Sequence, residues 1–245
     1  MYDLANPDRF DRFARTATPI VAAVALLILT LGLYFALFNS PADYQQGESV
    51  RIMYVHVPAA WMALMCYSAM AVSSVVGFIW KHPLADVAAK STAPIGAAFT
   101  LLALVTGSLW GRPMWGTWWA WDARLTSVLI LLFLYLGYMA SWSTFEDKTR
   151  AARVAAVICV VGFINVPIIK FSVDWWNSLH QPASVFRADG PSIHSSMLTP
   201  LLLMGLAYAL VFTALLFTSM RAELAERRIA RLEAGARAPS TVSVT

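Results

Sequence analysis

The octapeptide at positions 115–122, WGTWWAWD, is the densest concentration of residues in the chain that could bind a partner. It contains four tryptophans, a glycine and a carboxylate. Tryptophan has a large flat ring with one N–H donor, so several in one loop can bind a large planar molecule or anchor the chain at a membrane surface. Anchoring needs only one or two rings at a helix end. The octapeptide therefore favours a binding surface, and other residues must indicate what it binds.

Two of the four histidines occur in similar sequence contexts. His56, in RIMYVHVPAAW, and His180, in DWWNSLHQPAS, each precede a proline by two residues and have aromatic residues nearby. Pro58 suits the first turn of a helix, where the N–H that proline lacks has no partner. We therefore expect His56 to lie in a loop just outside that helix, as a neutral imidazole near its positive end. A loop histidine is most often only solvated, so either one alone is a weak candidate ligand.

Two imidazoles, an aromatic surface and nearby arginines are together the parts of a porphyrin site. A haem iron takes one axial imidazole on each face of the ring, and aromatic side chains can stack on the ring. Haem propionates pair well with guanidinium groups, for which Arg51 and Arg124 are the candidates. Either arginine could equally extend from a helix end to the membrane surface. The residue types thus suggest that His56 and His180 ligate haem iron.

The composition is that of an integral membrane protein. Of 245 residues, 59% are hydrophobic and 13% are charged, whereas about a quarter are charged in soluble domains. The net charge of +4 comes from basic residues at the ends of apolar segments, which indicates membrane topology and no nucleic acid partner. Cys66 and Cys159 form no C-x-x-C or C-x-x-C-H motif, so we expect buried thiols and no covalently attached haem. No nucleophile or phosphate-loop motif indicates a conventional enzyme.

Six apolar segments are long enough to span a membrane. We expect residues 1–219 to form an all-α bundle of six transmembrane helices with short loops, at about 19–38, 59–80, 93–111, 125–142, 154–171 and 197–219. The remaining residues, 220–245, are predicted to be a basic cytoplasmic tail that continues the last helix to about Leu232 and is disordered from Gly235 onward. No internal repeat of the inverted-repeat transporter type is evident.

The lysines and arginines predict the orientation of these helices. Most of the 18 basic residues lie in the two tails and in the second and fourth loops, which places both termini in the cytoplasm. The first, third and fifth loops should then face outward, to the periplasm of a Gram-negative cell. The tryptophan loop, between the third and fourth helices, thus shares the outer face with His56, His180 and His194.

The motif W-G-x-x-W-x-W-D resembles the tryptophan-rich signature of a superfamily of haem-handling membrane proteins. It is carried by Trp115, Gly116, Trp118, Trp121 and Asp122. Together with the two histidine segments and the six helices, the chain is similar to the CcmC family, the haem exporter protein C of the cytochrome c maturation pathway. The resemblance covers nearly the whole chain except the two tails.

The resemblance implies a haem-transfer protein of the bacterial inner membrane. Haem b would be held transiently by His56 and His180 at the periplasmic face and presented to the haem chaperone CcmE. The motif residues would form the platform where the two meet, with Trp119, at a variable motif position, as a neighbour. The small membrane protein CcmD and the ATP-binding cassette pair CcmA and CcmB would complete the assembly. His194 matches no motif.

Three other functions remain open at this point. A transmembrane haem transporter would need a polar route through the bilayer, and the spanning segments offer few ionisable residues. A quinol-oxidising cytochrome b would hold haem between histidines on spanning helices, whereas these histidines are expected in loops. An inert membrane subunit with interfacial tryptophans would bind no haem at all.

Overall fold

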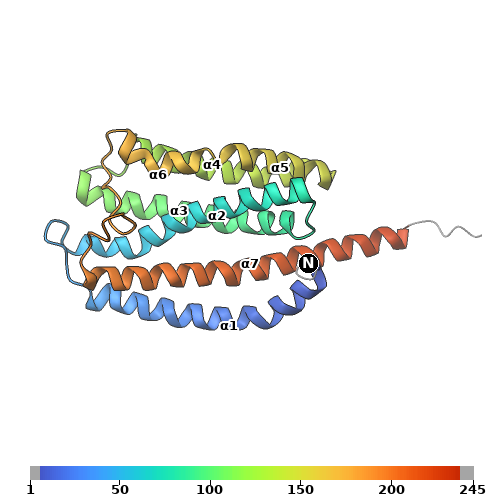
Figure 1. Cartoon of the computed structure of the whole chain (residues 1–245), viewed down its shortest axis with the longest axis horizontal. Coiled ribbons are helices and arrows are strands. Elements are labelled where there is room, and N and C mark those ends of the chain that lie inside the picture. Colours follow the sequence, from blue (N-terminus) through green and yellow to red (C-terminus); the bar gives the residue numbers. More distant parts are fainter. Residues whose placement is uncertain (1–5, 238–245) are drawn as a thin grey trace, which may run out of the picture.

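The computed structural model describes residues 6–237, which form a bundle of long helices (Figure 1). The α-helices of this part of the chain are α1 (Pro7–Tyr34), α2 (Met53–Trp80), α3 (Ala85–Trp115), α4 (Ala123–Thr144), α5 (Lys148–Gly162), α6 (Asn165–Trp175) and α7 (Ser195–Arg237). A π-helical turn, η2 (Phe35–Asn39), follows α1, and a 3-10 helix, η3 (Glu48–Ile52), leads into α2. The predicted all-α fold is confirmed.

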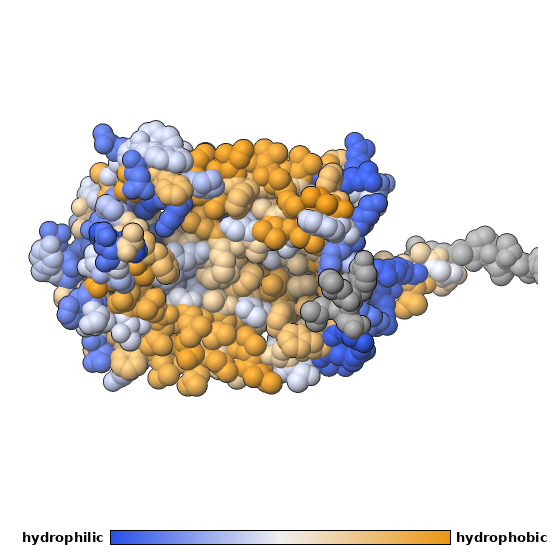
Figure 2. Space-filling model, viewed as in Figure 1, coloured by the Kyte–Doolittle hydropathy of each residue, from blue (hydrophilic) through white to orange (hydrophobic). Residues whose placement is uncertain are grey.

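Six helical stretches in the described residues are long and apolar enough to cross a membrane, as the sequence predicts. They are α1 with η2, η3 with α2, α3, α4, α5 with α6, and α7. On the face seen in Figure 2, apolar residues gather over the middle of the bundle and polar residues gather toward its two ends. This is the surface of a multi-pass membrane protein, because only the ends of such a bundle meet water.

The fifth span is broken into α5 and α6 between Gly162 and Asn165. Pro167 explains the break, because proline donates no N–H and its ring collides with the carbonyl of the residue four positions earlier, Phe163. The side chain of Asn165 donates a hydrogen bond to the carbonyl of Ser127 at 2.8 Å, which fixes α6 against α4. The break therefore sets the position of α6 beside the start of α4.

The prediction that Pro58 occupies the first turn of a helix, with His56 outside it, was wrong. The helix α2 begins at Met53, directly after η3, so both residues lie within it. Burial of Met53 and Tyr54 stabilises this earlier start, and the Tyr54 hydroxyl also hydrogen-bonds to Ser40. Tertiary packing thus overrides the preference of proline for a helix start.

Helices α2 and α3 pack together along their length at the centre of the bundle, and α1 packs along α7 at one side (Figure 1). Tyr135 of α4 crosses to α2 and donates its hydroxyl to the carbonyl of Ala63 at 2.8 Å. Cys66 and Cys159 are fully buried and are free thiols, as expected. The interior is therefore a packed helix–helix core.

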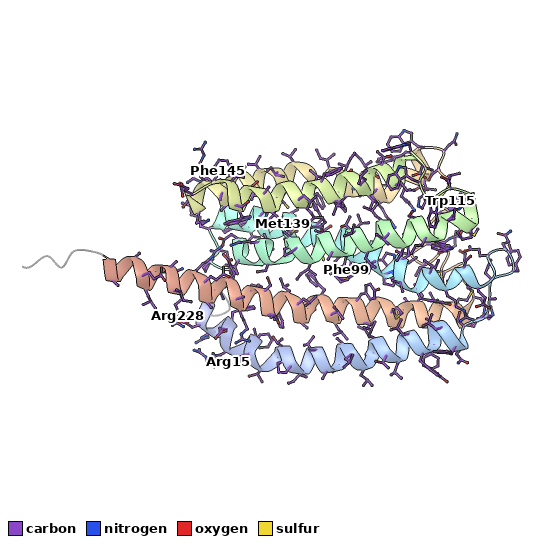
Figure 3. All side chains as sticks on the ribbon, turned by 180° about the vertical axis from the view of Figure 1, so that it is seen from behind. Arg15, Phe99, Trp115, Met139, Phe145 and Arg228 are labelled. Carbon is purple, nitrogen blue, oxygen red and sulfur yellow. The ribbon has the colours of Figure 1, made fainter. Side chains whose placement is uncertain are left out.

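Both ends of the described chain lie at one end of the bundle (Figure 1). Figure 3 shows Arg15 and Arg228 at this end and Trp115 at the opposite end. Ion pairs join α7 to α3 here, between Lys90 and Glu223 at 2.5 Å and between Arg227 and Asp86 at 2.8 Å. The tryptophan loop thus lies at the end of the bundle far from the termini.

The last helix, α7, extends well past the bundle (Figure 1). Its continuation through Leu232 agrees with the prediction. The helix also includes residues 235–237, the first part of the segment predicted to be disordered, and adding residues to a formed helix costs far less than starting one. The rest of that predicted segment, 238–245, lies outside the described residues.

Candidate functional site

Three separate segments meet at the end of the bundle that carries the tryptophan loop. His56 lies in the first turns of α2, Trp115 ends α3, Asp122 precedes α4, and His180 lies in the connection between α6 and α7. That connection crosses the end of the bundle from α6 to α7 (Figure 1). The helix ends therefore bring together residues that are far apart in the sequence.

The carboxylate of Asp122 joins the tryptophan loop to His180. Its Oδ1 accepts the backbone N–H of Leu125 at 2.7 Å and so caps α4. Its Oδ2 lies 3.0 Å from Nδ1 of His180 and accepts the hydroxyl of Ser178 at 2.7 Å. The Ser178 oxygen also accepts the backbone N–H of His180 at 3.1 Å. One side chain thus fixes both the start of α4 and the orientation of an imidazole.

The surroundings of Asp122 and His180 favour an ionised carboxylate beside a neutral imidazole. Burial raises the pKa of Asp122, but hydrogen bonds from Leu125, Ser178 and His180 outweigh burial and hold the pKa below its ordinary value. Burial lowers the pKa of His180, Asp122 partly offsets this, and the positive charge of Arg124 adds to the lowering. A neutral His180 then donates Nδ1–H to the carboxylate and keeps its Nε2 lone pair free.

The ring of His56 is held between α2 and α3. Its Nδ1 lies 3.0 Å from the carbonyl oxygen of Ala103 and 3.1 Å from Oγ1 of Thr106. A carbonyl can only accept, so Nδ1 of the neutral ring carries the proton, and Nε2 is again the free nitrogen. Gly107 makes room for the ring, because a Cβ atom at that position would lie 2.9 Å from Cε1 of His56.

The two imidazoles have equivalent open nitrogens. Both rings lie at the end of the bundle that carries the tryptophan loop, and neither Nε2 has a hydrogen-bond partner among the described residues. A fixed Nδ1–H and an open Nε2 are typical of metal-ligating histidines. The described residues contain no cluster of three or more His, Cys, Asp or Glu side chains that could hold a bare metal ion. Two imidazoles instead suit an iron that already has four porphyrin nitrogens.

The tryptophan loop starts at a sharp turn. Gly116 ends α3 in the left-handed conformation, with φ of 74°, which favours glycine. The ring of Trp115, just before this turn, meets the ring of His180 edge-on at 5.0 Å between centroids. The hydroxyl of Ser108 donates to the carbonyl of Trp118 at 2.7 Å and holds the loop against α3. The loop is therefore fixed on both sides of the turn.

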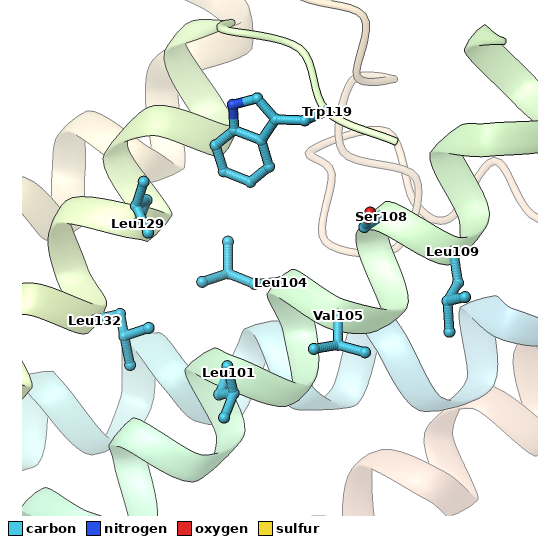
Figure 4. Close-up of a pocket in the computed structure, with 8 residues that line it drawn as sticks. All are labelled: Leu101, Leu104, Val105, Ser108, Leu109, Trp119, Leu129 and Leu132. Carbon is cyan, nitrogen blue, oxygen red and sulfur yellow. The ribbon is translucent and has the colours of Figure 1, made fainter. Parts of the chain in front are cut away.

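The four tryptophans divide into two that face inward and two that face outward. Trp118 and Trp121 are 55% and 79% exposed, whereas Trp115 and Trp119 are partly buried. Figure 4 shows the ring of Trp119 at one end of an apolar groove of about 380 Å³ between α3 and α4, lined by Leu101, Leu104, Val105, Ser108, Leu109, Leu129 and Leu132. Trp119 therefore anchors the loop, and Trp118 and Trp121 are the exposed rings of the tryptophan loop.

The two candidate arginines, Arg124 and Arg51, have different surroundings in the structure. Arg124 lies close enough to both histidines for its charge to act on them, and its Nε donates to the hydroxyl of Ser172 on α6 at 3.1 Å. Arg51 instead donates to the carbonyls of Ala36 and Leu37 at 2.9 and 2.6 Å and pairs with Glu48. Arg124 therefore belongs to the histidine cluster, while Arg51 closes the end of the first span.

His194 differs from the other two histidines on this side. Its Nδ1 accepts the backbone N–H of Ser196 at 3.3 Å, and its carbonyl accepts the N–H groups of Met197 and Leu198. The exposed ring thus caps the start of α7. Its Nδ1 also lies 2.8 Å from the hydroxyl of Ser196, so both contacts of this nitrogen are local contacts at the start of α7.

Sequence reasoning missed the side chains that hold the two imidazoles, which are Thr106, Gly107 and Ser178. It also missed Trp110 as a neighbour of His56. The ring of Trp110 meets His56 edge-on at 5.7 Å, and its N–H donates to Oε1 of Gln46 at 2.9 Å. Small residues such as Thr106 and Gly107 are common in membrane helices, and a serine such as Ser178 is common in loops. Residue type alone therefore did not indicate that these three residues hold the imidazoles.

Comparison with known proteins finds relatives that match most of the chain. The family model described as "CcmC: Heme exporter protein C" matches residues 1–235. A heme exporter protein C of Bradyrhizobium diazoefficiens is 56% identical over 233 residues, which cover 95% of this chain and 88% of that protein. Its namesake in Escherichia coli is 47% identical over 201 residues, covering 82% and 81%.

A plant relative matches as well. A ccmC-like mitochondrial protein of Marchantia polymorpha, named for cytochrome c biosynthesis, is 52% identical over 184 residues, or 75% of this chain and 78% of that protein. With the family model matching almost the whole sequence, the chain belongs to the heme exporter protein C (CcmC) family.

Proposed function

We propose that this protein binds haem b non-covalently at the periplasmic face of the bacterial inner membrane and presents it to the haem chaperone CcmE for covalent attachment. The observation that carries the proposal is that two imidazoles at the same end of the bundle both have fixed Nδ1–H groups and open Nε2 atoms. The names of the relatives support haem handling in cytochrome c biosynthesis.

His56 and His180 would supply the two axial ligands of the iron. Both axial positions would then be filled, which keeps oxygen from the iron during transfer. Trp115 packs edge-on against His180 and restricts the movement of that ligand. Arg124 is better placed than Arg51 to pair with a haem propionate. The guanidinium of Arg51 already donates hydrogen bonds to backbone carbonyls of the first span. These residues hold and orient the haem, and none of them forms a covalent bond with it.

Trp118 and Trp121 would form the surface where the chaperone docks. Their rings are the exposed part of the tryptophan loop, while Trp119 anchors the loop in the groove between α3 and α4 (Figure 4). A chaperone bound there would bring its histidine to the exposed edge of the porphyrin. The protein would thus accelerate attachment by proximity and orientation, and we assign it no conventional catalytic residue.

The family implies an assembly with CcmD and with the ATP-binding cassette pair CcmA and CcmB, which we adopt as part of the proposal. Both termini and the Lys90–Glu223 and Arg227–Asp86 ion pairs would then face the cytoplasm, where the positive-inside rule places such basic residues. A transmembrane haem transporter is the second function that we keep, since the family is named for haem export.

Replacing either proposed ligand should remove haem from the purified protein. We expect His56→Ala and His180→Ala each to lose most of the co-purified haem and the low-spin spectrum of a bis-imidazole complex, because one axial bond is lost. His194→Ala is the matched control and should keep both the co-purified haem and the low-spin spectrum. Haem content per protein and the visible absorption spectrum measure the outcome. Full haem and an unchanged spectrum in both variants would show that the ligands lie elsewhere.

Gly107→Ala should displace the His56 ring without changing any ligand. The added Cβ would lie 2.9 Å from Cε1 of His56, inside van der Waals contact, and overpacking of this kind typically costs about 1–3 kcal/mol. We expect a severalfold lower haem content, measured by absorbance on protein that remains folded.

The control for this substitution is Gly137→Ala on α4, where an added Cβ meets no atom within 4 Å. It should leave haem content unchanged. If Gly107→Ala bound haem as the wild type does, with the same spectrum, then the ring position seen here would be unimportant for binding.

Haem retention should be insensitive to pH until the solution is mildly acidic. The neutral form of His180 binds iron, and its lowered pKa means that protons begin to compete only below the ordinary histidine value of about 6.5. Asp122, whose pKa is also lowered, stays ionised throughout this range. Spectral titration from pH 8 downward should show constant binding to about pH 6.5 and a loss below it. A loss that begins near pH 7.5 would contradict the assignment.

A further inference from the structure

We infer that Asp122, acting through His180, makes the site selective for ferric over ferrous haem. The inference rests on the proposed function and concerns a positioning residue, because the Asp122 carboxylate contacts the ligand and not the iron. It starts from a difference between the two imidazoles. His180 donates Nδ1–H to an ionised carboxylate, whereas His56 donates to a neutral carbonyl and a neutral hydroxyl.

The geometry makes the carboxylate a strong partner. Oδ2 of Asp122 lies 3.0 Å from Nδ1 of His180, and the two side chains are only 8% and 19% exposed. Solvent therefore screens their interaction weakly. Ser178 donates to the same Oδ2 at 2.7 Å, and the capping bond from Leu125 holds Oδ1 at 2.7 Å. The carboxylate cannot rotate away from the imidazole without breaking these two bonds.

The preference for ferric haem follows from the charge of the porphyrin core. A ferric porphyrin core carries a net charge of +1 and a ferrous core carries none. A carboxylate that accepts the Nδ1–H of an axial imidazole increases the electron density that the ligand gives to iron. It therefore stabilises the ferric state more than the ferrous state and lowers the reduction potential. Hydrogen bonding around an axial ligand is one of the recognised means by which proteins set haem potentials.

Other charges near the site do not cancel this effect in a comparison of variants. Arg124 hydrogen-bonds to Ser172 and to the carbonyl of Lys170, and the charges of Asp122 and Asp174 also act on it. Asp122→Asn therefore removes one negative charge from the surroundings of both His180 and Arg124, and both changes raise the potential. The potential of this variant relative to the wild type thus reports on the charge of the Asp122 carboxylate.

The test is a redox titration of haem-loaded protein, followed by visible absorption, for the wild type and for Asp122→Asn. Asparagine is as good an N-cap as aspartate, so α4 should stay capped through Oδ1. We expect at least a tenfold loss of preference for ferric haem, which is a rise in midpoint potential of about 59 mV for one electron. Asp122→Glu, which keeps the charge, should stay closer to the wild type.

Thr106→Val is the matched control on the other ligand. It removes a neutral partner of His56 and adds no charge, so its midpoint potential should shift much less than that of Asp122→Asn. The g-values of the ferric protein in electron paramagnetic resonance give an independent reading of the charge donated by the axial imidazoles. They should change in Asp122→Asn and stay nearly constant in Thr106→Val.

Two outcomes would overturn the inference. One is an unchanged potential in Asp122→Asn with haem still bound through two imidazoles. If Asp122→Asn binds haem too weakly for redox titration, ferric and ferrous haem are titrated separately into the apoprotein. The second outcome is then an equal loss of affinity for ferric and for ferrous haem, which would mean that Asp122 only positions His180. Failure of the proposed function is distinct, because the wild type itself would then lack the bis-imidazole spectrum.

Discussion

The buried carboxylate of Asp122 holds the site together. It uses one oxygen to cap α4 and the other to accept the Nδ1–H of His180. The start of α4, the end of the tryptophan loop and the connection between α6 and α7 are thereby fixed to one another by a single side chain. A capping bond alone typically contributes about 0.5–2 kcal/mol, and a hydrogen bond to a charged group about 1.5–3 kcal/mol. The same carboxylate selects the imidazole tautomer that can bind a metal.

The helices hold the two imidazoles in fixed positions, which a flexible loop could not do. His56 lies in α2 and is fixed by the backbone of α3, with Gly107 leaving space for its ring. The break before Pro167 turns α6 against α4, and Arg124 then reaches Ser172 from the first turn of α4. The apolar groove between α3 and α4 takes the ring of Trp119 and leaves Trp118 and Trp121 exposed. Each of the two imidazoles is thus supported by at least two helices.

Much of this could be predicted from the sequence, because hydrophobic length and the position of basic residues are strong signals. The six spans and the grouping of His56, His180 and the tryptophan loop at one end follow from them. The start of α2 was missed, because burial of Met53 and Tyr54 decides it and no local motif does. The roles of individual tryptophans were not predictable either, since all four are the same residue type and only their packing differs. The resemblance placed Asp122 in the platform where haem and the chaperone meet, but it gave no sign that the carboxylate would hydrogen-bond to His180.

The central claim is that two imidazoles bind haem iron through Nε2 while their Nδ1 atoms keep the partners seen here. A high-resolution structure of the haem-loaded protein in a lipid nanodisc tests it most directly. The iron should lie between the Nε2 atoms of His56 and His180, with Nδ1 of His180 still at the Asp122 carboxylate and Nδ1 of His56 still at the carbonyl of Ala103. Iron ligated by His194, or haem bound in the groove beneath Trp119 away from both imidazoles, would contradict the account.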